Sequence, residues 1–61
     1  MNTASKINVA FIDDHHGIRE EVLQLLESDT SIQAMGYESA EEALKSFMEK
    51  APDVVLMDIN L

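Results

Sequence analysis

The stretch that decides the fold is Pro52-Asp53-Val54-Val55-Leu56-Met57-Asp58-Ile59-Asn60-Leu61. Its apolar run, residues 54–57, opens with two β-branched residues and ends at the carboxylate of Asp58. An unbroken apolar run of this length is typical of a strand buried on both faces of a helix-covered parallel sheet. Ligands bind beyond the carboxyl ends of such strands, so Asp58 is placed where a binding site is expected.

Two further strands precede this one in the sequence. Ile7–Ile12 is mostly apolar, is rich in strand-forming residues, and ends at Asp13 and Asp14. Ile32–Tyr37 is a weaker strand pattern, and its internal Gln33 and Gly36 favour a position at the edge of the sheet.

A helix is predicted in each of the two connections. After Gly17, apolar residues recur at helical spacing, namely Ile18, Val22, Leu25 and Leu26. The residues expected to face water are Arg19, Glu20, Glu21, Gln24 and Glu27. The second helix begins at Ser39, which forms a capping box with Glu42. Its apolar stripe is Ala40, Ala43, Leu44, Phe47, Met48 and Ala51. Pro52 then marks the exit into the final strand.

The order of elements is therefore β-α-β-α-β. Crossover connections that carry a helix require parallel strands. With the weakest strand outermost, the spatial order of the strands is 2-1-3, and the two helices cover opposite faces of the sheet. This arrangement is one half of a doubly wound, flavodoxin-like α/β fold.

The composition excludes several classes of protein. The 61 residues form at most one small domain, and the formal charge of −8 disfavours direct contact with nucleic acid. The chain has no cysteine, so neither a disulfide framework nor a thiolate metal site is expected. No apolar run approaches the roughly 20 residues that span a bilayer, and the amino terminus lacks a signal-peptide pattern. We expect a cytoplasmic protein that does not associate with membranes.

The candidate chemistry collects at the ends of the first and third strands. Neighbouring parallel strands lie roughly 4.8 Å apart with their carboxyl ends on the same side, so Asp13, Asp14 and Asp58 should converge. Three carboxylates repel one another unless one is protonated or a cation binds. Mg²⁺ fits best, because it accepts one or two carboxylates and retains several waters. One of the carboxylates is then available as a nucleophile toward a phosphoryl group.

Simpler interpretations exist for each of these residues. An aspartate at a strand end is often a turn former or a helix cap, and Asp13 or Asp14 would suit the first helix in that way. His15 and His16 resemble a metal-binding pair, but adjacent side chains at a helix start point apart, which favours solvated or capping roles. The coincidence of three carboxylates at strand ends favours the functional interpretation.

The sequence resembles the amino-terminal half of a response-regulator receiver domain from two-component signalling. Ile12-Asp13-Asp14-His15 is similar to the acidic pair of that family, and Val55-Leu56-Met57-Asp58-Ile59-Asn60-Leu61 to its phosphoacceptor motif. Asp13-Asp14-His15-His16-Gly17-Ile18-Arg19 resembles a variant common in regulators with a helix-turn-helix DNA-binding output. Residues 1–61 are thus expected to form a partial receiver domain with the first three strands and two helices.

The resemblance implies a role for each matching residue. Asp58 would accept the phosphoryl group from a phosphohistidine on a sensor histidine kinase. Mg²⁺ would be held by Asp14 directly, by Asp13 chiefly through water, by Asp58, and by the backbone carbonyl of Asn60. The hydroxyl residue, the lysine and the aromatic switch residue of the family's later strands do not occur in residues 1–61.

We therefore expect a phosphoacceptor module, not an enzyme, that controls transcription within a phosphorelay. One rival is an interaction module that forms a homodimer through the open edge of the third strand without being phosphorylated. A small metal-dependent phosphotransferase is a second rival, for which no general base or substrate pocket is evident.

Overall fold

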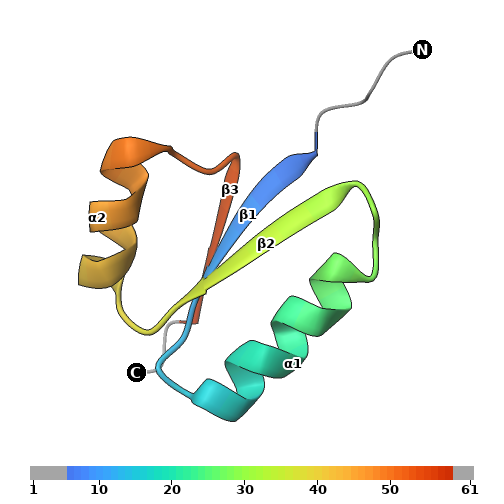
Figure 1. Cartoon of the computed structure of the whole chain (residues 1–61). Coiled ribbons are helices and arrows are strands. Elements are labelled where there is room, and N and C mark those ends of the chain that lie inside the picture. The colour runs from blue at the N-terminus through green and yellow to red at the C-terminus, as the bar shows by residue number, and fades with distance from the viewer. Residues whose placement is uncertain (1–5, 59–61) are drawn as a thin grey trace.

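The computed structural model describes residues 6–58 and contains all five expected elements. These are β1 (Ile7–Ile12), α1 (His16–Glu27), β2 (Ile32–Tyr37), α2 (Ala40–Glu49) and β3 (Val54–Met57) (Figure 1). The three strands form one parallel sheet in the order β2-β1-β3, which confirms the predicted topology. No helix among these residues is long and apolar enough to cross a bilayer.

The core is built around β1, the central strand of the sheet. β1 pairs with β2 along its whole length and with β3 over its last four residues. The two helices lie on opposite sides of the sheet, and each contacts β1 and β2 (Figure 1). The buried apolar side chains are accordingly those of Val9, Ala10, Phe11, Ile12, Ala34 and Ala43.

β3 is only partly covered. All four of its residues are 39% to 50% exposed, although an unbroken apolar run is typical of a strand covered on both faces. The reason is that the helices contact β1 and β2 but not β3. Within residues 6–58, β3 also pairs with β1 alone.

Two reciprocal hydrogen bonds join β1 to the chain at the amino end of β3. The backbone N–H of Asn8 donates to Oδ2 of Asp53 at 2.8 Å, and the N–H of Asp53 donates to the carbonyl of Asn8 at 2.8 Å. Asp53 therefore lies at the amino end of β3, at the opposite end of the strand from Asp58.

α1 meets the sheet with only part of its predicted apolar stripe, since Val22 and Leu26 are partly buried and Ile18 and Leu25 are not. The partly buried residues of this helix are Arg19, Val22, Leu23 and Leu26. Ile18 and Leu25 are exposed, whereas Leu23 and the stem of Arg19 pack where Gly36 of β2 leaves room. The helix is thus rotated so that Arg19, which was expected to face water, lies on its sheet-facing side.

α2 begins where the sequence predicts, but it ends before Ala51, the last residue of its predicted apolar stripe. Ser39 is its N-cap residue and its Oγ accepts a hydrogen bond from the N–H of Glu42 at 3.1 Å. The Glu42 carboxylate reaches back one residue beyond the cap and accepts from the N–H of Glu38 at 2.9 Å. The helix stops at Glu49, so Ala51 is not part of it, because the residue before a proline is pushed toward extended backbone.

Candidate functional site

Asp13 is the buried residue of the acidic pair that follows β1. Its backbone N–H continues the sheet by donating to the carbonyl of Tyr37 at 3.0 Å, and its side chain is only 2% exposed. Oδ1 accepts a hydrogen bond from the backbone N–H of His15 at 2.9 Å, in the manner of an Asx turn. That backbone hydrogen bond is the main reason why the pKa of Asp13 lies below its usual value, while burial opposes the shift. Asp13 is therefore held as a carboxylate in a fixed position.

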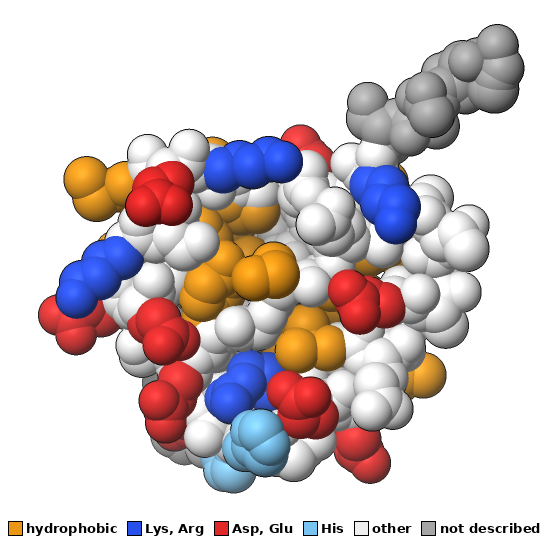
Figure 2. Space-filling view, in the orientation of Figure 1, with side chains coloured by type: hydrophobic (Ala, Val, Ile, Leu, Met, Phe, Trp, Pro, Cys, Tyr) orange, Lys and Arg blue, Asp and Glu red, His pale blue; other side chains and the backbone are white. Residues whose placement is uncertain are grey.

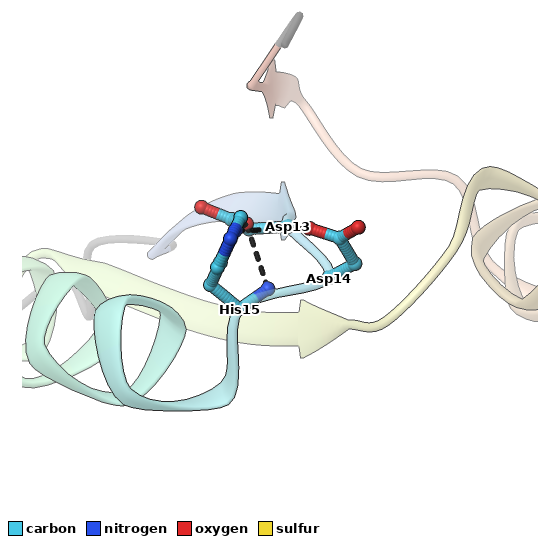
Figure 3. Close-up of side chains that lie close together, drawn as sticks. All are labelled: Asp13, Asp14 and His15. Carbon is cyan, nitrogen blue, oxygen red and sulfur yellow. Dashed lines mark hydrogen bonds and ion pairs between the residues drawn. The ribbon is translucent and has the colours of Figure 1, made fainter.

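Asp14 and His15 complete a cluster of possible metal-binding groups. The Nδ1 atom of His15 lies 3.0 Å from Oδ1 of Asp14 and 3.2 Å from Oδ1 of Asp13. The candidate ligand atoms of all three residues lie within 4.8 Å of one another (Figure 3). Asp14 differs from Asp13 in exposure, since its side chain is 77% exposed.

The surrounding carboxylates favour a protonated His15. Its hydrogen bond with Asp13 is the largest cause of a raised pKa, followed by the negative charges of Asp14, Asp13 and Asp58. Desolvation opposes this rise. When protonated, the His15 imidazole carries positive charge beside both carboxylates.

The involvement of His15 was missed in the sequence. We expected the adjacent histidines to be solvated or to cap the helix, and they do have different partners, since His16 faces Arg19 at 3.1 Å. His15 occupies the N-cap position of α1 through its backbone, but its side chain makes no capping hydrogen bond. The sequence does contain a signal for this contact, namely that His15 lies two residues after Asp13. In an Asx turn, the carboxylate of an aspartate accepts a hydrogen bond from the N–H of the residue two positions later. Neither Asp13 nor Asp14 is the N-cap residue.

Asp58 lies beside this cluster at the end of β3. Its backbone N–H donates to the carbonyl of Ile12 at 3.2 Å, so Asp58 adjoins Asp13 across the β1–β3 ladder. Its carboxylate is not among the three groups that lie within 4.8 Å of one another. Asn60, the fourth candidate ligand, lies outside the described residues.

A separate hollow in the structure takes no part in this site. It encloses about 190 Å³ between α2 and the sheet, and its polar lining includes Asn8, Gln33, Ser46 and Lys50. Figure 2 shows hydrophobic side chains open to solvent on the face between the two helices. None of the candidate carboxylates lines the hollow.

Residues 9–61 match the model of the response regulator receiver domain. The chain belongs to this family. Receiver domains act in two-component signalling, where sensor histidine kinases phosphorylate them, and they bind Mg²⁺ at an acidic pocket. The residues of this chain suit such an ion, because Asp13 and Asp14 present hard oxygen ligands side by side at the end of a central strand.

The curated relatives of this chain include both an enzyme and response regulators. It is 41% identical over 56 residues to a protein-glutamate methylesterase/protein-glutamine glutaminase of Syntrophus aciditrophicus, covering 90% of this chain and 16% of the relative. It is 39% identical over 56 residues to the response regulators GacA of Pseudomonas viridiflava and UvrY of Escherichia coli, covering 90% of this chain and 26% of each relative. The chain thus spans about a sixth to a quarter of the length of these proteins. No solved structure matches it.

Proposed function

We propose that this chain is the phosphoacceptor portion of a two-component response regulator, in which Asp58 receives the phosphoryl group. The observation that supports the proposal is the hydrogen bond from the Asp58 N–H to the Ile12 carbonyl, which sets Asp58 next to the acidic pair. In the transfer, a carboxylate oxygen of Asp58 attacks phosphorus while the bond from phosphorus to the kinase imidazole breaks. The imidazole nitrogen keeps the electron pair, and an acyl phosphate forms on Asp58.

The proposed metal ligands are Asp13, Asp14, Asp58 and the backbone carbonyl of Asn60. The difference in exposure between the acidic residues supports a division of roles. The side chain of Asp14 is 77% exposed, so an ion can reach its carboxylate directly even though its Oδ1 also lies 3.0 Å from Nδ1 of His15. The carboxylate of Asp13 is buried and accepts the N–H of His15, which suits a water-mediated contact. Bound Mg²⁺ would supply the positive charge that offsets the charge of the phosphoryl oxygens.

We further propose that residues 1–61 contribute three strands and two helices to a cytoplasmic regulator of transcription. The similarity to GacA and UvrY, both named response regulators, supports a regulatory output. With a formal charge of −8, this segment would leave any contact with DNA to other parts of the protein. Its own role would be that of a phosphoacceptor and not that of an enzyme.

Phosphorylation of the full-length protein by a small phosphodonor and Mg²⁺ tests the role of Asp58. Asp58→Asn should abolish the label, and the label on the unmodified protein should be lost in alkali, as an acyl phosphate is. Asp53→Asn is the matched control, because Asp53 lies at the other end of β3 and asparagine keeps the oxygen that accepts from Asn8. Label that survives in Asp58→Asn, or disappears in Asp53→Asn, rejects the assignment.

A second candidate function follows from the exposure of β3. The four apolar β3 residues are partly open to water, and within the described residues one side of the strand has no paired neighbour. Two copies that paired β3 to β3 across a two-fold axis would meet antiparallel and form a six-stranded sheet. Sedimentation of the 61-residue chain tests this: a stably folded monomer at high micromolar concentration argues against it.

A further inference from the structure

The position of Arg19 is not explained by the apolar pattern of α1. Arg19 is partly buried on the sheet-facing side of the helix, in line with Val22, Leu23 and Leu26. Its stem lies over Gly36 of β2, where a β-carbon would be 3.1 Å from Cδ and 3.2 Å from Cγ of Arg19. The aliphatic part of the side chain is therefore confined between the helix and the strand.

This confinement aims the guanidinium at the loop that carries the acidic pair. Nη1 of Arg19 donates to the backbone carbonyl of Asp13 at 2.6 Å, and Nη2 lies 3.1 Å from Nδ1 of His16. The carbonyl of Asp13 belongs to the peptide that joins Asp13 to Asp14. A fixed guanidinium therefore restricts rotation of that peptide. Because the peptide joins the two residues, the orientations of the Asp13 and Asp14 side chains are restricted as well.

We propose that Arg19 is a positioning residue for the acidic pair, holding the Asp13–Asp14 peptide in the orientation that binds the metal ion. The inference deepens the proposed Mg²⁺ site and rests on it. Arg19 does not touch the ion. It acts through the Asp13 carbonyl, as outer residues around metal sites orient the ligands and tune affinity.

Charge and geometry predict opposite effects when Arg19 is replaced. Arg19 carries a positive charge close to Asp13, where it favours the carboxylate form electrostatically. If charge were its only influence, its removal would strengthen the binding of a cation, because a repulsive charge would be lost. If Arg19 positions the acidic pair, its removal weakens binding. The sign of the change therefore identifies the role.

The test compares Mg²⁺ binding to the full-length protein and its Arg19→Met variant by titration of backbone amide shifts. Methionine keeps an apolar stem over Gly36 but cannot donate to the Asp13 carbonyl. We expect affinity about tenfold weaker, at the lower end of the range for residues that orient metal ligands. Lys45→Met is the matched control, since it removes the same charge from an exposed position on α2 and should leave affinity nearly unchanged. Unchanged or tighter binding in Arg19→Met overturns the proposal.

A second measurement separates this inference from the proposed function. Hydrogen exchange of the His15 N–H, which is bonded to the Asp13 carboxylate, reports the order of the loop without any metal ion. In Arg19→Met this amide should exchange faster than in the unmodified protein, while the Phe11 amide in β1 should be unaffected. An unchanged His15 exchange rate overturns the positioning role. Absence of Mg²⁺ binding to the unmodified protein overturns the proposed metal site instead.

Discussion

The two glycines of the chain allow one substitution to be tested in two environments. Neither Gly17 nor Gly36 has a positive φ, so alanine is compatible with the backbone at both positions. The difference lies in the space around them. A β-carbon at Gly17 would have no atom within 4 Å, whereas one at Gly36 would lie 2.7 Å from Cδ1 of Leu23. The same mutation should therefore change stability in opposite directions.

The magnitude at Gly36 follows from the packing of α1 against β2. Favourable contacts between carbon atoms lie at about 3.5–4.0 Å, so the new methyl group comes roughly 1 Å too close to Leu23. It also crowds the stem of Arg19 at 3.1 and 3.2 Å. Overpacking of this kind costs about 1–3 kcal/mol, against a gain of about 0.4–1 kcal/mol from the stiffer unfolded chain. The difference between these ranges is a loss of up to about 2.5 kcal/mol in the free energy of unfolding, smaller the more easily the Leu23 methyl group moves aside.

Gly17→Ala should instead raise stability by about 0.4–1 kcal/mol, because alanine restricts the unfolded chain and fits the backbone at this exposed position without strain. Thermal unfolding of both variants, followed by circular dichroism at one protein concentration, measures the difference. Each kcal/mol corresponds to about 4–8 °C in a domain of this size. If Gly36→Ala stabilises the protein as Gly17→Ala does, α1 does not approach β2 as closely as described.

Three further predictions concern the cap of α2 and the acidic site. Ser39→Ala should cost about 1 kcal/mol of stability, measured by thermal unfolding, because the N–H of Glu42 loses its acceptor; Ser39→Asp should restore most of it. In metal-free protein, the pKa of His15, followed by NMR, should exceed the usual value of about 6.5. The contacts of protonated His15 then stabilise the fold fully below pH 6.5, and this stabilisation is lost as the pH rises through the raised pKa. His15→Gln should remove this change of stability with pH. A His15 pKa below the usual value would contradict the contacts described. Titration with Mg²⁺ should change the backbone amide chemical shifts of Asp13, Asp14 and Asp58. Changes confined to the helix surfaces would argue against the proposed metal site.

The order of elements and the placement of the acidic residues followed from the sequence alone. The mostly apolar stretch Ile7–Ile12 and the unbroken apolar run Val54–Met57 identify strands, and each is followed directly by aspartate. Helical crossovers force the strands to be parallel, and that brings both strand ends to the same edge of the sheet. Local pattern and chain connectivity are sufficient for this result. The strand order and the family were therefore predictable before any side chain was placed.

Only the tertiary structure decided which face of α1 meets the sheet. Ile18 and Leu25 of the predicted stripe are exposed, whereas Val22 and Leu26 of the same stripe are partly buried, so periodicity settled the orientation of the helix only in part. The choice depends on the gap that Gly36 leaves in β2, which is remote in sequence and accepts Leu23 and the stem of Arg19.

The same holds for the contacts of His15. The turn that Asp13 forms brings the His15 imidazole close to two carboxylates. A sequence pattern records which residues prefer to be buried or paired. The neighbours that bury or pair them are set by packing between distant segments, and packing exists only once the chain has folded.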